Sequence, residues 1–93
     1  MTSTILGWHN GEWGSADALG MPLTDRGLQL ADGLFETVLI QDGNAQLLSE
    51  HLQRWQHGAA RLGMAAPPAR PWLEDLVGEA ITRAALNRAG TTG

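Results

Sequence analysis

The chain has 93 residues, of which 43% are hydrophobic and 17% charged, a composition typical of one small folded domain. Its net charge of −4 disfavours binding to nucleic acid or to an anionic membrane, and no apolar run approaches the roughly 20 residues of a membrane span. Cysteine is absent, which excludes disulfides and thiolate metal sites and is compatible with the reducing cytoplasm, where we expect the protein to reside.

The first predicted element is a hairpin near the start of the chain. Residues 5–8 form a short apolar run that meets Asn10 and Gly11, a pair suited to the positive φ angles of a type I′ turn. The chain then resumes as a strand at Glu12 and Trp13. Residues 14–24 mix small and turn-forming residues without a sustained period, which predicts a loop with at most one brief strand.

A second hairpin is predicted over residues 34–48. Residues 34–40 are rich in β-favouring side chains, Asp42 and Gly43 form the turn, and residues 45–48 return as the partner strand. Because strand side chains alternate, one face of the first strand carries Phe35, Thr37 and Leu39. The other face carries Leu34, Glu36, Val38 and Ile40.

Two helices are predicted after the second hairpin. The first runs from about residue 50 to 62, with Ser49 as its N-cap, and stops at Gly63. Its apolar stripe consists of Leu48, Leu52, Trp55, Ala59 and Leu62. The second begins at Pro71 and ends near Asn87, and residues 90–93 are expected to form a turn. Its stripe consists of Leu73, Leu76, Val77, Ala80 and Ala84.

Together these elements predict an α+β fold over residues 1–93, a small antiparallel sheet built largely from two hairpins and packed against two helices. All six basic residues are arginines, and lysine is absent. No side chain of this chain can therefore form the Schiff base that lysine forms with an aldehyde cofactor, and we expect no catalytic residue in it.

Several motifs occur in a fixed order. An Asp-Arg-Gly block at 25–27 and an Asp-Gly-Leu-Phe-Glu block at 32–36 precede the second hairpin, and His51-Leu52-Gln53-Arg54 opens the following helix. Over about residues 7–64 this order resembles the N-terminal region of class IV (fold type IV) pyridoxal-phosphate enzymes, which include aminotransferases and aminodeoxychorismate lyases. The resemblance implies the N-terminal lobe of a homodimeric enzyme. The Schiff-base lysine of such enzymes belongs to a C-terminal domain that these residues do not include.

The resemblance assigns Arg54 to the arginine that binds the phosphate of pyridoxal 5′-phosphate. A planar guanidinium can hold two phosphate oxygens at once, which suits this role. The alternative is an exposed pair between Glu50 and Arg54 at i,i+4 spacing, which contributes about 0.3 to 0.5 kcal/mol.

The resemblance also places Phe35, Thr37 and Leu39 on the active-site side of their strand. Phe35 would wall the substrate pocket, Thr37 would offer a hydroxyl near the cofactor, and Leu39 would lie at the rim. Many relatives carry a basic residue at the position of Leu39, so the leucine removes one means of binding a substrate carboxylate. The alternative is that all three residues pack in the core.

The remaining polar residues carry less functional signal. His9, His51 and His57 lack metal-ligand spacing and a carboxylate cluster, so no metal site is expected, and His51 is expected to order the start of its helix or the neighbouring loop. Asp25 and Asp32 flank turn residues, where aspartate commonly bonds to its own backbone, so we interpret them as structural.

Three functions are compatible with the sequence. The first is part of a lyase that eliminates pyruvate from aminodeoxychorismate to give 4-aminobenzoate for folate synthesis, which the Phe-Glu-Thr block at 35–37 favours by resemblance. The second is part of a class IV aminotransferase acting on branched-chain or D-amino acids. The third is a non-catalytic dimerisation or ligand-binding module of the same fold.

Overall fold

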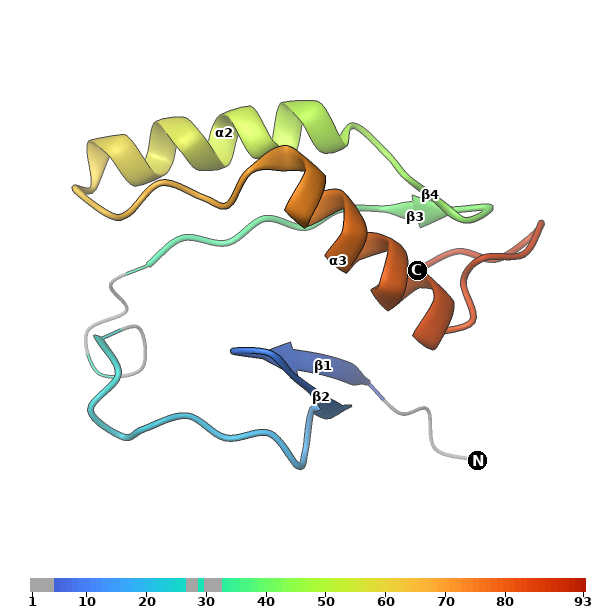
Figure 1. The fold of residues 1–93 in the computed structure, drawn as a ribbon, viewed down its shortest axis with the longest axis horizontal. Coiled ribbons are helices and arrows are strands. Elements are labelled where there is room, and N and C mark those ends of the chain that lie inside the picture. Colours follow the sequence, from blue (N-terminus) through green and yellow to red (C-terminus); the bar gives the residue numbers. More distant parts are fainter. Residues whose placement is uncertain (1–4, 27–28, 30–32) are drawn as a thin grey trace. The chain divides into compact units, whose positions relative to one another are not determined.

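Two hairpins and two helices make up the part of the chain that the computed structural model describes, residues 5–26, 29 and 33–93 (Figure 1). The predicted α+β fold is therefore confirmed. The chain divides into two compact units, residues 1–33 and residues 34–93. Asp32, interpreted above as structural, lies outside the described residues.

The first unit contains the predicted hairpin of β1 (Leu6–His9) and β2 (Glu12–Ser15), paired antiparallel with Trp8 opposite Trp13. Asn10 and Gly11 have φ angles of 48° and 90°, so the positive-φ turn is confirmed. The chain then folds back over the hairpin. A Cβ atom at Gly7 would lie only 2.6 Å from the Leu19 side chain, so the missing side chain at Gly7 makes room for Leu19.

The second hairpin is shorter than predicted. Its strands are β3 (Ile40–Gln41) and β4 (Asn44–Ala45), joined by Asp42 and Gly43 with φ angles of 52° and 80°. Residues 34–39 precede β3 as an extended segment outside the ladder, because α2 begins too early for residues 46–48 to continue as their partner. The final hairpin bond runs from the Gln46 amide to the Leu39 carbonyl at 2.8 Å.

Residues 91–93 lie on the outer edge of β3, and the prediction of a simple turn there was wrong. Ile40 and Gly93 exchange two backbone hydrogen bonds of 2.8 and 2.9 Å, and the Asp42 amide donates to the Thr91 carbonyl. The Asp42 carboxylate also accepts a hydrogen bond of 2.6 Å from the Gly90 amide. The last described residues thus extend the hairpin by a third antiparallel segment.

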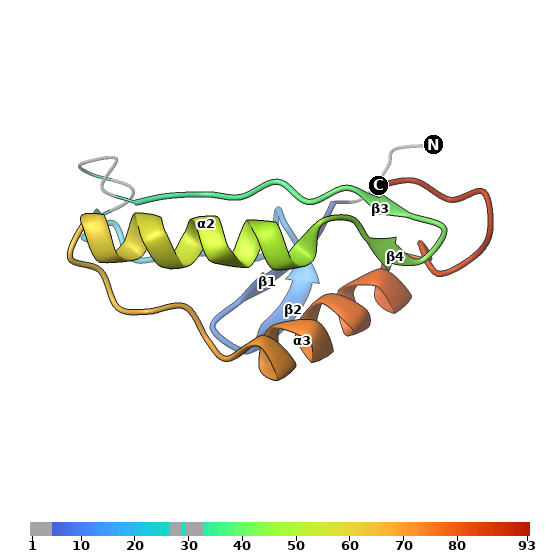
Figure 2. The ribbon, with the colours of Figure 1, turned by 90° about the horizontal axis from the view of Figure 1, so that it is seen from above.

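Helix α2 (Leu48–Arg61) begins earlier than predicted, and Leu47 rather than Ser49 is its N-cap. Leu47 takes a left-handed conformation, with φ 55°, and no side chain caps the helix. The stripe is confirmed at Leu52 and Ala59, which are buried, whereas Leu62 is exposed. The helix lies alongside residues 34–39 in both views of the ribbon (Figure 2).

Helix α3 (Arg70–Arg83) has Pro71 in its first turn, where the missing N–H costs no helical bond. It ends before the predicted Asn87, because Ala85 is left-handed and the Leu86 amide donates back to the Ile81 carbonyl at 2.9 Å. Ile81, which the predicted stripe omitted, is buried, and Ala84 is exposed. Among the described residues, no helix is long and apolar enough to cross a bilayer.

Candidate functional site

Three polar side chains meet where the extended segment 34–39 passes α2. His51 and Arg54 are three positions apart on α2, so they share one side of the helix. Glu36 reaches them from the extended segment, on the same side of that segment as Leu34 and Val38. These two side chains are half-buried, and a Cβ at Gly58 of α2 would lie 3.0 Å from Leu34.

Glu36 and Arg54 form a two-pronged ion pair. Arg54 Nε donates to Glu36 Oε1 and Arg54 Nη2 donates to Glu36 Oε2, both at 2.9 Å. Paired contacts of this kind are the strongest geometry for a guanidinium and a carboxylate, because both hydrogen bonds are charge-assisted and parallel. They connect the extended segment to α2 across 18 positions of sequence.

His51 completes the cluster. Its Nδ1 atom lies 3.1 Å from Glu36 Oε2 and 3.0 Å from Arg54 Nη2. When Nδ1 carries a proton it donates to the glutamate, and when it does not it accepts from the arginine. His51 therefore supports the ion pair in either tautomer, in addition to its expected position at the start of the helix.

The three side chains differ in exposure. The Glu36 and His51 side chains are 19% and 15% exposed, whereas the Arg54 side chain is 68% exposed. The carboxylate and the imidazole are thus mostly enclosed, whereas the guanidinium extends into solvent. Within the described residues no partner is found for Arg54 Nη1.

The contacts set the charge states of the ion pair. The hydrogen bonds from Arg54, and next from His51, lower the pKa of Glu36 from 4.5 to about 2. The hydrogen bond from Glu36 in turn raises the pKa of Arg54 above its ordinary value. Both groups are therefore charged throughout the physiological pH range.

The alternative pairing of Arg54 with Glu50 is not formed, because the guanidinium is held by Glu36 instead. No role was predicted for Glu36 from the sequence. One signal was available: Glu36 is a charged residue on an otherwise apolar face of its segment, between Leu34 and Val38, where a carboxylate needs a partner.

Phe35, Thr37 and Leu39 lie on the opposite side of the extended segment, as the predicted alternation requires. All three are exposed, with Phe35 at 89% and Leu39 at 48%, whereas the intervening residues are half-buried. The alternative that they pack in the core of this chain was therefore wrong. The structure brings the three together on one open face, separate from the face that meets Arg54.

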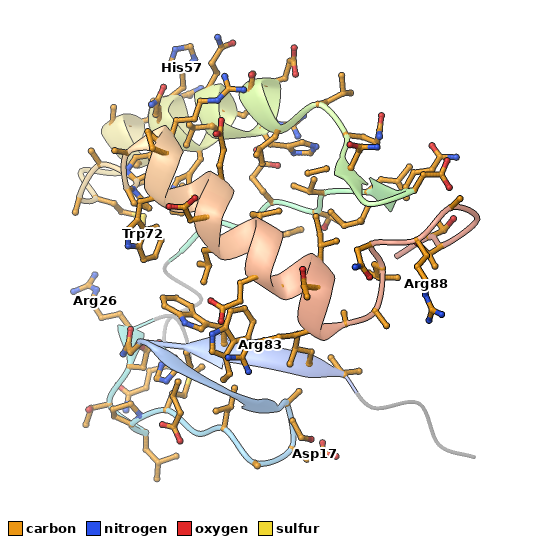
Figure 3. All side chains as sticks on the ribbon, turned by 45° about the vertical axis from the view of Figure 1, so that its right-hand side comes forward. Asp17, Arg26, His57, Trp72, Arg83 and Arg88 are labelled. Carbon is orange, nitrogen blue, oxygen red and sulfur yellow. The ribbon has the colours of Figure 1, made fainter. Side chains whose placement is uncertain are left out.

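The other histidines lie apart from this cluster. His57 projects from α2 and is exposed (Figure 3). His9 lines a shallow apolar hollow of the first unit with Trp8, Leu19 and Met21. Across residues 5–26, 29 and 33–93, no group of three or more histidine, cysteine, aspartate or glutamate side chains could hold a metal ion.

The Arg54 guanidinium has an end that could receive an anionic group such as a phosphate. Its Nε and Nη2 edge is held by Glu36, and its Nη1 end is open, so a phosphate oxygen can be received without breaking the ion pair. A strongly exposed guanidinium has room for an anion of this size, and its positive charge is fixed.

A protein family and one characterised protein are similar to this chain. The family described as amino-transferase class IV matches residues 33–92, a range that includes the whole cluster. A bifunctional aminodeoxychorismate lyase / D-amino acid transaminase from Mycobacterium tuberculosis is 39% identical over 56 residues, which cover 57% of this chain and 19% of that protein. The chain thus spans about a fifth of the length of this relative. No solved structure matches the chain.

Proposed function

Because this chain belongs to the class IV aminotransferase family, we propose that it is the N-terminal, cofactor-binding lobe of a pyridoxal-phosphate enzyme. Enzymes of this family use pyridoxal 5′-phosphate and act on small-molecule substrates. The observation that carries the proposal is the Arg54 guanidinium, anchored along one edge by Glu36 and open at the other. In this role Arg54 binds the cofactor phosphate.

The cofactor, when bound, acts as a sink for electrons released from the substrate. The residues of this chain bind and orient it, because lysine, which attaches such cofactors covalently, is absent here. We therefore assign catalysis to a further domain outside these residues. We also propose that two such chains pair as a homodimer in the cytoplasm.

The reaction we favour is the elimination of pyruvate from aminodeoxychorismate to give 4-aminobenzoate for folate synthesis. The relative from Mycobacterium tuberculosis carries a lyase activity in its name, which supports this choice. On this proposal Phe35, Thr37 and Leu39 form one wall of the substrate pocket. Their exposure on one open face leaves them accessible to a substrate or to a second lobe.

A transaminase is the second candidate, because the same relative is also named a D-amino acid transaminase. Leu39 does not separate the transaminase from the lyase, because aminodeoxychorismate also carries carboxylates with which a leucine cannot pair. The Phe-Glu-Thr block at 35–37 is what favours the lyase over this candidate and over a branched-chain aminotransferase, by resemblance. A non-catalytic dimerisation or ligand-binding module of this fold is a third candidate, and it is separated from the enzymes by whether a domain that carries a lysine accompanies these residues.

Phosphate recognition is tested by titrating pyridoxal phosphate into the wild-type chain and into Arg54→Ala, with binding measured by equilibrium dialysis. A hydrogen bond to a charged group contributes about 1.5 to 3 kcal/mol, so the dissociation constant should rise about ten- to a hundredfold. Arg54→Lys should recover only part of the affinity, because an ammonium keeps the charge but loses the planar geometry.

Two controls isolate the phosphate. Pyridoxal lacks the phosphate group, so its weaker binding should be the same in wild type and Arg54→Ala. Glu50→Ala changes an exposed acid one turn before Arg54 and should leave both affinities unchanged. Equal affinity of wild type and Arg54→Ala for pyridoxal phosphate would refute the proposed role.

A further inference from the structure

We propose that Glu36 is a positioning residue for Arg54, which fixes the plane of the guanidinium so that its Nη1 end is presented to the phosphate group of a ligand. This inference rests on the proposed function, because it assigns a task to Arg54 that the family match alone does not test. Nothing in the sequence analysis assigned Glu36 to the site.

An exposed arginine side chain has considerable conformational freedom. Arg54 stands on α2 with 68% of its side chain exposed, where an unpaired arginine would sample many rotamers. The two parallel bonds to Glu36 remove that freedom before any ligand arrives. A group ordered in advance costs less to order on binding, which is the basis of preorganisation.

The position of the anchoring bonds decides which part of the guanidinium stays available. They occupy Nε and one hydrogen of Nη2. Nη2 also lies 3.0 Å from His51 Nδ1, whereas both hydrogens of Nη1 remain available at the end of the side chain away from Glu36. A phosphate is therefore received at Nη1, and not along the Nε edge.

Glu36 is itself held in place. His51 Nδ1 lies 3.1 Å from its Oε2 atom, and the carboxylate is only 19% exposed. Leu34 packs against α2 at Gly58, which fixes the extended segment two residues before Glu36. The carboxylate is thus more enclosed than the guanidinium that it positions.

An opposing effect must be weighed. A carboxylate near a bound phosphate repels it, so removal of Glu36 relieves a repulsion as well as freeing Arg54. The bound phosphate would lie at an exposed group, where water and salt screen charge–charge repulsion. The loss of Arg54 ordering should therefore outweigh the relief of repulsion. Freeing one long side chain corresponds to about a two- to tenfold loss of affinity.

The test compares dissociation constants for pyridoxal phosphate in wild type, Glu36→Gln, Arg54→Ala and the double variant. Glu36→Gln should weaken binding about two- to tenfold, since an amide keeps at most one acceptor for the guanidinium. The double variant should bind no more weakly than Arg54→Ala alone, because Glu36 acts only through Arg54. Glu74→Gln removes the glutamate of another exposed arginine pair, with Arg70, and should leave the affinity unchanged.

Each outcome has one meaning. If Arg54→Ala binds pyridoxal phosphate as wild type does, the proposed function fails. If Arg54→Ala weakens binding but Glu36→Gln binds as tightly as wild type or more tightly, only the positioning role is overturned. If Glu36→Gln does not fold, nuclear relaxation of the wild-type Arg54 Nε–H decides. A rigid signal supports the role, and a mobile one overturns it.

Discussion

Glu36 and Arg54 face each other edge to edge, with two hydrogen bonds of equal length joining a carboxylate on an extended segment to a guanidinium on a helix. The relationship joins parts of the chain that are 18 positions apart. It also makes the stability of the fold depend on pH.

Acid should destabilise the wild-type chain through Glu36. The pKa of this carboxyl is lowered to about 2 in the folded chain, so the unfolded chain binds more protons at intermediate pH. The contribution of Glu36 is fully present above its unfolded pKa and is lost as the pH falls from about 5 to about 2. Urea unfolding across this range should show a smaller decrease in the free energy of unfolding for Glu36→Gln than for wild type. Equal decreases in the two chains would contradict the prediction.

The isolated chain should catalyse neither pyruvate elimination nor transamination, because it has no lysine. Borohydride reduction of a mixture with pyridoxal phosphate, followed by mass spectrometry of peptides, checks this. Adducts should be confined to the α-amino group of the first residue, which serves as an internal control for the chemistry. A reduced adduct on a side chain, or pyruvate release from aminodeoxychorismate, would count against the prediction.

The chain should associate with itself through the face that carries Phe35 and Leu39. An exposed pair of large apolar side chains on one side of an extended segment favours burial against a second surface. Phe35→Ser should shift sedimentation toward the monomer while changing the free energy of unfolding by no more than about 0.5 kcal/mol. A wild-type chain that stays monomeric at high concentration would exclude this association.

Local sequence signals predicted the turns and the side-chain alternation well. Asn10-Gly11 and Asp42-Gly43 adopt the positive φ angles that these residue types tolerate, and the alternation of 34–39 appears in the exposed fractions. Both depend on residues within a few positions of one another. The dihedral preferences and the period of a strand act at that range.

The features that sequence reasoning missed depend on distant partners or on unusual conformations. Arg54 was given the helical neighbour Glu50 because i,i+4 spacing is visible in a sequence, whereas Glu36 becomes a partner only when its segment packs on α2. Leu47 and Ala85 have the left-handed conformation that glycine or asparagine usually takes. The predicted start of α2 and the predicted end of α3 therefore differ from the observed ones.

Gly43→Ala should destabilise the second unit more than Gly63→Ala does. Both glycines have positive φ, 80° and 68°, and a left-handed alanine costs about 1 to 2 kcal/mol. At Gly43 the new methyl would also lie 3.3 Å from backbone atoms of Asn87, whereas at Gly63 it meets nothing within 4 Å. Urea unfolding of both variants measures the difference, and an equal or larger loss at Gly63 would contradict the contact with Asn87.

Gly78→Ala should stabilise α3, because a glycine inside a helix costs about 0.5 to 1 kcal/mol relative to alanine. Nothing lies within 4 Å of the added methyl, so no contact opposes the gain. Gly58→Ala is the matched variant in α2, where the methyl would meet Leu34 at 3.0 Å. Thermal unfolding should give Gly78→Ala a higher Tm than wild type and than Gly58→Ala. A lower Tm for Gly78→Ala would contradict the prediction.

The pairing of β3 with residues 91–93 has a consequence for the order of events during synthesis. Asp42 and Gly90 are 48 positions apart, so a ribosome adding about 5 to 20 residues per second needs about 2 to 10 s to make the second after the first. A hairpin closes in microseconds, so β3 and β4 can pair long before their third segment exists. Until the third segment is made and pairs, the outer edge of β3 has unpaired amide and carbonyl groups, which are a template for pairing with another chain.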